Sequence, residues 1–341
     1  MGITIKDIAK EASVSIATVS RVINNKSQGV GKETRKKILS IMEKYNYVPS
    51  SVARGLVTKK TNIIGLILPD INNPFFPGIV RGAEDAANKY GYNIILCNTD
   101  DNEKRERTYI QILKEKCVEG ILYTSILNNK NKNVKLFYQH NIPFVSLDRS
   151  VDMKNVPFVC TNGEIGMHKI VEYLVQNGHA EIAYISGEKQ IETSYSRLQG
   201  YKKALNKFGI PINEKIIKYG DYKINSGRAC IRELLDSNET FTAVACENDL
   251  MAIGALEVLN NRNIKVPQQI SITGYDNIFL TNVTFPKLTT IAQPTYDMGY
   301  KAVELLMSII NKEENYKKQI VLEPDLVIRD SVFKQKDFHY I

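Results

Sequence analysis

Aromatic and polar side chains gather in the loops that follow the predicted strands of this chain. Asn73, Phe75 and Phe76 follow the first strand, and Asp148 and Arg149 follow a later one. The remaining loops carry the rest of this set, which is Arg197, Tyr222, Asn248, Asp276 and Gln293. A small polyhydroxylated ring suits such a set, because its C–H faces pack on aromatic rings while its hydroxyls donate to carboxylates and accept from guanidinium groups. These loops therefore predict a sugar-binding site.

Each of these residues also has a purely structural explanation. Carboxylates at strand ends often cap helices, and the pair Phe75 and Phe76 could belong to a hydrophobic core. These explanations weaken because all the residues occupy the equivalent end of successive strands. Ligands of parallel sheets bind at the carboxyl ends of the strands.

The sequence offers no catalytic motif. It lacks the phosphate-binding patterns GxGxxG and GxxxxGK[ST], a nucleophile elbow and HExxH, and its four histidines are scattered at 140, 168, 179 and 339. The five cysteines form no CxxC pair, so no zinc site is implied. We predict that the protein is not an enzyme and uses neither a cofactor nor a metal ion.

Strands and helices alternate from Asn62 onward. The first such unit has a strand over Ile63–Leu68, a helix over Phe75–Tyr90 and a strand over Ile94–Cys97, and a similar unit recurs after residue 160. Alternation of this kind predicts parallel sheets covered by helices on both faces, here in two similar lobes. The second unit and the other predicted strands are Ile182–Ser186, a helix over Ser194–Phe208, Ile216–Tyr219, Gly120–Thr124, Phe144–Leu147, Val244–Cys246 and Ile270–Gly274.

The first 24 residues predict two short helices joined by a tight turn. Thr4 and Asp7 have the spacing of a capping box, and Ser15 is a natural N-cap for the second helix. The second helix leaves a slim, basic face exposed, which suits the major groove of DNA. An ordinary helical hairpin is the alternative. The residues of that outward face are Ile16, Ala17, Ser20, Arg21 and Asn24.

A third helix is predicted from about Lys32 to Tyr45. Its apolar residues Ile38, Leu39, Met42 and Tyr45 are expected to pack on the first two helices. The basic residues near its start are placed for phosphate contacts, and they are Lys32, Arg35, Lys36 and Lys37.

The positive charge of the chain is confined to its beginning. The formal net charge is +8, and residues 1–60 hold 12 Lys and Arg against 4 Asp and Glu, whereas the remainder is balanced. A basic module on a neutral body is the electrostatic pattern of a polyanion binder. A merely solvated basic face would not explain why the remaining residues are neutral.

Residues 47–60 read as a linker that a partner could order into a short helix. Such a helix is too short to be stable alone, and Gly55 weakens it further. Leu56 has no obvious core to join, so beside a DNA-binding module it could act as a wedge between base steps.

The composition and the termini favour a cytoplasmic protein. The chain of 341 residues is 43% hydrophobic and 24% charged, it has no apolar run of about 18 residues, and its N-terminus has no apolar signal region. The neighbours of the five cysteines are mostly apolar, which predicts buried, reduced thiols.

Taken together, the chain resembles transcriptional regulators of the LacI/GalR family over nearly its whole length. The motifs that carry the resemblance are "TIKDIAKEASVSIATVSRVIN", "YVPSSVARGL", "IGLILPDINNPFF", "SRLQGYKKAL", "CENDLMAIGALEVL", "ITGYDN" and "TTIAQP". Ser13 departs from the Gly that many members have in the turn. The resemblance implies an all-α helix-turn-helix domain followed by a two-lobed α/β domain like that of periplasmic binding proteins.

The resemblance also implies domain limits and DNA-binding residues. The domains are 1–46, the hinge 47–60 and the effector and dimerisation domain 61–341, with an N-lobe of about 61–160 and 291–320 and a C-lobe of about 161–290 and 321–341. Ile16, Ala17 and Arg21 would read bases, and Leu56 would intercalate. The full set implied to bind DNA is Thr4, Ser15, Ile16, Ala17, Thr18, Ser20, Arg21, Asn24, Ser50, Ala53 and Leu56.

The implied partners are double-stranded operator DNA, a second copy of the chain and a small sugar. The loop residues resemble those of ribose-binding proteins most, so ribose or a related pentose is the expected effector, and repression relieved by the sugar is the expected sign. The rival is a catabolite-control regulator whose co-repressor is a seryl-phosphorylated carrier protein. Tyr296 and Asp297 fit that branch, whereas Glu304 stands where it has a basic residue. A sugar-binding transport protein would not explain residues 1–60.

Overall fold

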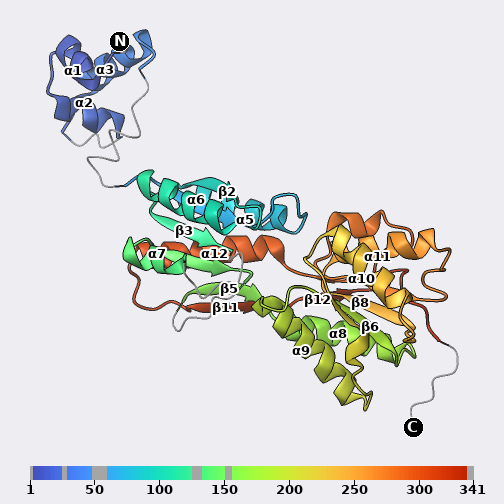
Figure 1. Ribbon diagram of the computed structural model, residues 1–341. Coiled ribbons are helices and arrows are strands. Elements are labelled where there is room, and N and C mark those ends of the chain that lie inside the picture. The colour runs from blue at the N-terminus through green and yellow to red at the C-terminus, as the bar shows by residue number, and fades with distance from the viewer. Residues whose placement is uncertain (1–2, 25–28, 48–59, 125–132, 150–155, 336–341) are drawn as a thin grey trace. The chain divides into compact units, whose positions relative to one another are not determined.

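The computed structural model describes residues 3–24, 29–47, 60–124, 133–149 and 156–335. The chain forms two compact units, Met1–Thr61 and Asn62–Ile341 (Figure 1). Each unit has its own hydrophobic core.

The first unit is a bundle of short helices. Its described elements are α1 (Ile5–Ala12), α2 (Ile16–Ile23) and α3 (Lys32–Lys44). Ile8, Val19, Val22 and Ile38 are fully or almost fully buried where the three helices meet. An ion pair of 2.9 Å between Lys44 and Glu11 joins α3 to α1 at the surface.

Side-chain caps define the ends of the first two helices. Thr4 and Asp7 form the predicted capping box, in which the Asp7 carboxylate accepts from the Thr4 backbone N–H at 2.9 Å. The Ser15 hydroxyl accepts from the Thr18 backbone N–H at 3.2 Å and so caps α2. Ser13 between the helices has φ 58°, which is the left-handed conformation that glycine adopts without strain. The turn therefore explains why Gly is usual at this position.

The prediction of which residues of α3 face the core was wrong for two of the four residues. Leu39 and Tyr45 are exposed, whereas Ile41, which the sequence analysis did not include, is buried beside Ile38. Ile38, Ile41 and Met42 have the i, i+3, i+4 spacing of one helical face, and Leu39 lies outside that stripe.

The N-lobe of the second unit is built on a parallel sheet. Within the described residues its strand order is β11-β5-β4-β3-β1-β2, and every neighbouring pair is parallel. One core lies between the sheet and helices α5 and α12, and another lies between the sheet and α6 and α7. The elements are β1 (Ile63–Leu68), α5 (Phe76–Lys89), β2 (Asn93–Asn98), α6 (Glu103–Glu115), β3 (Gly120–Tyr123), α7 (Val134–Gln139), β4 (Phe144–Leu147), β5 (Phe158–Thr161), α12 (Thr295–Ile310) and β11 (Gln319–Leu322).

The C-lobe repeats this arrangement on a smaller scale. Among the described residues its strand order is β7-β6-β8-β9, again parallel throughout. Helices α8 and α9 cover one face and α10 and α11 cover the other (Figure 1). The elements are α8 (Gly163–Gln176), β6 (Ile182–Ser186), α9 (Glu192–Lys207), η1 (Glu214–Ile216), β7 (Ile217–Tyr219), α10 (Ile224–Leu235), β8 (Ala243–Cys246), α11 (Asp249–Asn261), β9 (Ser271–Thr273) and η2 (Phe279–Asn282).

The last part of the chain passes between the lobes. Strand β10 (Thr290–Ala292) pairs antiparallel with β12 (Asp325–Val327), and the segment between them returns to the N-lobe as α12 and β11. Strand β11 remains in the N-lobe sheet as far as Leu322, two residues beyond the limit predicted near 320. Helices α5 and α12 approach closely, since a Cβ at Gly82 would lie 1.9 Å from the carbonyl oxygen of Tyr296. The architecture thus confirms the prediction of an all-α domain followed in sequence by a two-lobed α/β fold.

The cysteine prediction was only partly right. Cys97, Cys230 and Cys246 are buried thiols, but Cys160 is half-buried and Cys117 is exposed. Cys117 follows α6 in a turn with φ 53°, at the surface, and Val118 is the only apolar residue beside it in a charged stretch of the sequence. Burial raises the pKa of Cys97 to about 11, which keeps this thiol protonated.

Candidate functional site

The residues predicted from the loops converge on one pocket between the two lobes. Each follows the carboxyl end of a strand or stands in the helix that comes next, which is where a parallel sheet presents its ligands. Gln293 stands apart from the lining but hydrogen-bonds one of its members. The predicted residues that line the pocket are Asn73, Phe75, Phe76, Asp148, Arg149, Arg197, Tyr222, Asn248 and Asp276.

Phe75 and Phe76 form the aromatic side of this pocket at the start of α5. Both rings are at least nine-tenths buried, and they pack edge to face with their centroids 5.2 Å apart. The Asn73 side chain accepts from the Phe75 backbone N–H at 3.0 Å, which fixes the turn before the helix. The two phenylalanines therefore serve as core and as pocket lining together.

Arg197 is the buried cation of the pocket. It projects from α9 with 3% exposure, donates from Nη1 to the Glu247 carbonyl at 2.7 Å, and lies with Nη2 3.9 Å from the Asp276 carboxylate. Its guanidinium stacks on the Tyr275 ring, 3.9 Å from the centroid. Among the described residues its Nε–H has no acceptor, so a donor is left for a ligand or a water.

Asp276 opposes Arg197 from the end of β9. Gln293 donates to its carboxylate at 2.7 Å and in turn accepts from the Thr161 hydroxyl, which belongs to the N-lobe. Burial raises the pKa of Asp276 well above its usual value, while Arg197 lowers it. Asp276 also has φ 115°, an unfavourable backbone conformation held by its surroundings.

Asp148 and Arg149 come directly after β4. Burial raises the pKa of Asp148, and the nearby guanidinium groups of Arg149 and Arg197 oppose that rise. Asp148 has φ 65°, so the chain turns sharply at the strand end and brings the two side chains into the pocket. The Arg149 guanidinium lies 5.6 Å from the centroid of the Tyr222 ring, which belongs to the other lobe.

Tyr222 is held by a buried glutamate that the sequence analysis did not identify. Its hydroxyl donates to Glu247 Oε1 at 2.8 Å and lies 2.5 Å from the Ser194 hydroxyl. The position of the Tyr222 ring also requires glycine at position 187, because a Cβ there would lie 2.3 Å from Cζ of Tyr222. Tyr222 therefore presents mainly its ring to a ligand, since its hydroxyl already has two partners.

Asn248 also has a structural role. Its Oδ1 caps α11 by accepting from the Met251 backbone N–H at 3.0 Å, and its Nδ2 donates to the Tyr222 carbonyl at 2.9 Å. The side chain is 1% exposed. Asn248 thus shapes the pocket wall through the capping role that its position at a helix start allows.

Two residues of the site escaped the sequence analysis. Thr193 lines the pocket one turn before Arg197 on α9, and this i, i+4 spacing was a signal in the sequence that could have found it. Glu247 lies behind the lining and is fully buried. Its carboxylate accepts from Tyr184, Ser186, the Gly187 backbone and Tyr222, contacts that only the folded sheet creates.

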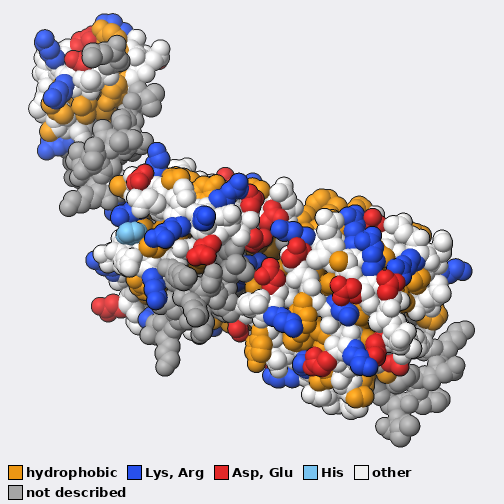
Figure 2. Space-filling view, viewed as in Figure 1, with side chains coloured by type: hydrophobic (Ala, Val, Ile, Leu, Met, Phe, Trp, Pro, Cys, Tyr) orange, Lys and Arg blue, Asp and Glu red, His pale blue; other side chains and the backbone are white. Residues whose placement is uncertain are grey.

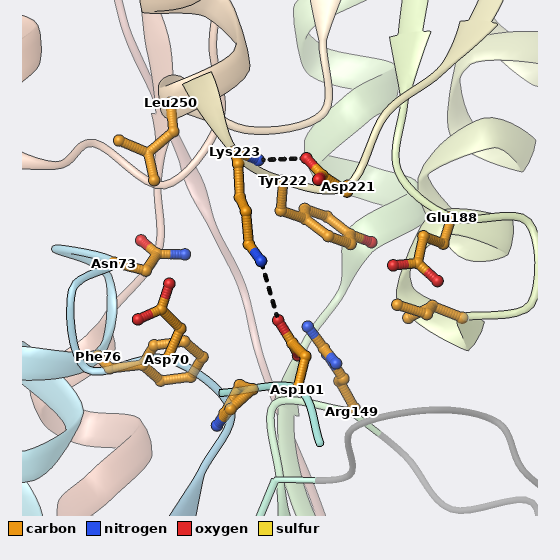
Figure 3. A pocket seen from close by; sticks show the side chains of 12 residues that line it. Asp70, Asn73, Phe76, Asp101, Arg149, Glu188, Asp221, Tyr222, Lys223 and Leu250 are labelled. Atoms are coloured by element: carbon orange, nitrogen blue, oxygen red, sulfur yellow. Dashed lines mark hydrogen bonds and ion pairs between the residues drawn. The ribbon is translucent and has the colours of Figure 1, made fainter. Parts of the chain in front are cut away.

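The outer part of the pocket is rich in charge (Figure 3). Lys223 of the C-lobe reaches across to Asp101 of the N-lobe, with 3.8 Å between the Lys223 ammonium and the Asp101 carboxylate. Asp70, Glu188 and Asp221 add further negative charge around this opening. This outer part, which we call the mouth of the pocket, therefore has more acidic than basic side chains and contains an ion pair between the lobes.

We expect the Glu247 carboxylate to stabilise the fold mainly as a hydrogen-bond acceptor, and its negative charge to contribute less. Glu247→Ala removes the acceptor of several buried donors, and leaving such groups unpaired should lower the free energy of unfolding by about 3 kcal/mol. Glu247→Gln keeps one oxygen for those donors and can donate to the Tyr222 hydroxyl. Its free energy of unfolding should therefore fall much less than that of Glu247→Ala. Urea unfolding of both variants measures the difference, and equal stabilities would contradict this role.

Most of the residues predicted to form the outward face of α2 lie at the surface. Ile16, Ala17 and Arg21 are exposed, with Ile16 at 46%, whereas Ser20 is half-buried and accepts from the Asn24 amide. Ser15 and Thr18 share a hydroxyl contact of 2.9 Å at the helix start, and Thr4 caps α1. Figure 2 shows Lys and Arg at several places on the visible face of this unit, and fewer Asp and Glu. The predicted residues Ser50, Ala53 and Leu56 lie outside the described residues.

Two classes of feature are absent from the described part of the chain. It has no cluster of three or more His, Cys, Asp or Glu that could hold a metal ion. Its helices include none long and apolar enough to cross a bilayer.

The two units define a regulator that joins a helix-turn-helix to a two-lobed binding domain. Residues 4–50 match the model of bacterial regulatory proteins of the lacI family, and residues 61–330 match that of periplasmic binding proteins and sugar-binding domains of the LacI family. The chain belongs to the LacI family and is a DNA-binding transcriptional regulator, as the resemblance predicted.

Curated relatives span almost the whole chain. The HTH-type transcriptional regulator RegA of Clostridium saccharobutylicum is 39% identical, covering 97% of this chain and 99% of the relative. The ribose operon repressor of Halalkalibacterium halodurans is 39% identical over 96% of both chains. Catabolite control protein A of Priestia megaterium is 39% identical, over 92% of this chain and 94% of the relative.

Solved structures agree with this family. The lac repressor dimer bound to operator and an anti-inducer is 28% identical with a TM-score of 0.88, over 98% of this chain and 100% of that one. A LacI-family regulator of Enterococcus faecium with bound ribose is 31% identical with a TM-score of 0.71, over 80% and 100%. A CelR–cellobiose complex is 30% identical with a TM-score of 0.75, over 96% and 99%.

Proposed function

We propose that this regulator is a repressor whose binding to operator DNA is controlled by a small sugar, ribose or a related pentose. The observation that carries the proposal is the pocket between the lobes, in which aromatic rings, two carboxylates and two guanidinium groups converge. The ribose-bound relative and the ribose operon repressor support the same choice.

The pocket has the groups that a neutral sugar needs. Asp148 and Asp276 can accept from ring hydroxyls, Arg149 and Arg197 can donate to them, and the rings of Phe75 and Phe76 can cover the C–H face. The acidic mouth disfavours a phosphorylated sugar, because approaching phosphate would meet more negative than positive charge.

The proposed switch is a change in how the lobes close. A sugar that contacts Asp148 of the N-lobe and Arg197 of the C-lobe together binds the closed arrangement better than an open one, and so shifts the population toward closure. The Asp101–Lys223 ion pair would add to the closed state. In a homodimer, this movement would reach the hinge of 47–60 and Leu56, and would release the two recognition helices from the operator.

The test is release of DNA by sugar. A duplex enriched from random sequence by the full-length protein serves as the operator, and its affinity is measured with and without ribose, xylose, arabinose and glucose. We expect one pentose to weaken the complex at least tenfold and to bind the free protein by calorimetry. An absence of binding by every sugar would refute the proposal.

The alternative is control by a seryl-phosphorylated carrier protein, which the similarity to catabolite control protein A favours. The surface of α5 and α12 argues against it. Glu304 pairs with Lys89 at 3.8 Å, and Lys89 also donates to the Tyr300 hydroxyl, so the basic side chain beside Glu304 is already engaged. Adding the phosphorylated carrier to the same DNA assay distinguishes this alternative from sugar control, because a co-repressor would strengthen the complex of the regulator with DNA.

A further inference from the structure

The loop that carries Asp276 has an unfavourable backbone conformation at two consecutive positions. Asp276 has φ 115° and Asn277 has φ 56°. Non-glycine residues at positive φ persist only where their surroundings hold them, because each such conformation costs free energy. The Asp276 N–H donates to the Ile291 carbonyl at 2.8 Å, which fixes one side of the loop. The contacts on its other side therefore help to decide where the Asp276 carboxylate points.

Asp249, the first residue of α11, supplies those contacts. Its Oδ2 accepts from the Ile278 N–H at 2.8 Å, and its Oδ1 accepts from the Thr290 hydroxyl at 2.6 Å. Its own N–H donates to the Tyr275 carbonyl at 2.8 Å. Asp249 is fully buried and lies outside the lining of the pocket between the lobes, which we call the sugar pocket. It thus holds the chain on both sides of Asp276.

Charged and titratable groups of neighbouring segments act on Asp249. Arg329, from the segment after β12, favours its ionised form, and the thiol of Cys246 and the carboxylate of Asp276 interact with its charge. Burial raises the pKa of Asp249, and the hydrogen bond from Thr290 opposes that rise. Burial also raises the pKa of Asp276, and the negative charge of Asp249 adds to that rise. Asp249 therefore acts on Asp276 through the backbone and through its charge.

We propose that Asp249 is a positioning residue for sugar binding, which holds the loop 275–278 so that the Asp276 carboxylate meets the ligand. This inference rests on the proposed sugar control. Asp249 acts through Asp276 and does not itself contact the sugar. An aspartate that only favoured the start of α11 could do so from the surface, without buried contacts to Ile278 and Thr290. Gly274 fits the proposal, since a Cβ there would lie 2.0 Å from Asp249 Oδ1.

The experiment compares sugar affinity with stability in variants of the full-length protein. Calorimetry with ribose, xylose and arabinose and urea unfolding are carried out on the parent, Asp249→Ala, Asp249→Asn, Thr290→Val and His179→Ala. Asp249→Ala removes both acceptors, Asp249→Asn keeps one oxygen for the Ile278 N–H, and Thr290→Val removes one donor with little change of shape. His179→Ala is the control, because this buried side chain contacts Thr242 at 2.9 Å where β6 and β8 begin, at the opposite end of the sheet.

We expect Asp249→Ala to bind the pentose at least about tenfold more weakly than the parent, because both loop contacts are lost. Asp249→Asn and Thr290→Val, which each keep one contact, should lose about threefold. His179→Ala should also unfold at a lower urea concentration, but its sugar affinity should stay within about twofold of the parent.

The pH dependence of sugar binding gives a readout that a purely structural role of Asp249 would not change. In the parent, sugar affinity should be greatest where Asp276 is ionised and should fall as the pH falls through its raised pKa. Asp249→Asn removes a negative charge that contributes to that rise, so the midpoint of the fall should move to lower pH. Arg197 and Asp148 also act on Asp276, but they do so in both proteins and produce no such shift. His179→Ala should leave the midpoint unchanged.

Three results would overturn the positioning role. If the parent binds a pentose and either Asp249→Ala or Thr290→Val binds it as tightly, the role is refuted and sugar control stands. The same holds if the midpoint of Asp249→Asn does not move. Thr290→Val keeps the test valid if Asp249→Ala does not fold, because the Asp249 carboxylate is then still present. If no sugar binds the parent, the positioning role and the proposed function fail together.

Discussion

Replacing Arg197 with methionine should abolish sugar binding and lower the free energy of unfolding by about 3 to 5 kcal/mol. Methionine preserves much of the aliphatic volume but removes a guanidinium that is buried against Tyr275 and Asp276. The Asp276 carboxylate would keep only Gln293 as its described hydrogen-bond partner, and a buried carboxylate without a countercharge is strongly disfavoured. The Glu247 carbonyl would also lose its donor.

The matched control is Arg228→Met on α10. Arg228 is more exposed and pairs with Glu257 at 2.6 Å outside the pocket, so its loss should change stability by less than about 1 kcal/mol and leave sugar binding unchanged. Chemical unfolding and calorimetry on both variants provide the comparison. Parental sugar affinity in Arg197→Met would show that this guanidinium is not part of the site.

Affinity for the operator should fall roughly 10³-fold or more when salt rises from about 50 to 200 mM. The reason is release of counterions from DNA by the basic first unit, whose exposed cations near the start of α3 include Lys32, Lys36 and Lys37. A dimer would double these contacts. The logarithm of the affinity against the logarithm of the salt concentration should be a line of steep negative slope.

Two variants separate the phosphate contacts of the first unit from its contacts to bases. Lys37→Ala should make the salt slope shallower by about one for each subunit and leave the sequence preference unchanged. Arg21→Ala should relax the preference at one base position in each half-site, because bidentate contacts to guanine discriminate by about 1 to 3 kcal/mol. A flat salt response of the parent would contradict DNA binding through this unit.

Local patterns in the sequence were enough to predict the architecture. Strands such as Ile63–Leu68, Phe144–Leu147 and Ile182–Ser186 have the predicted bounds, because continuous apolar runs between turn residues can be buried only within a covered parallel sheet. Asp148 and Asp276 follow strands, and Arg197 lies in the helix after β6. The sequence therefore predicted that they meet, since parallel strands place their carboxyl ends at one edge. The capping box of α1, the N-cap of α2 and the charge surplus of the first unit were equally local.

Tertiary packing decided what these patterns could not. The sequence does not distinguish Glu247 from a surface glutamate, yet the sheet buries it among four donors, and these partners lie on other strands and loops. Exposure of Leu39 and Cys117 likewise depends on which neighbours happen to cover them. A cavity beside the sugar pocket is lined by Gly163 and Ser196, which come from different helices, and by Asp148 after β4, a combination that only the folded chain creates. Residue types determined that this protein binds DNA through one module and predicted a sugar site in the other, whereas long-range packing determined the shape of that site.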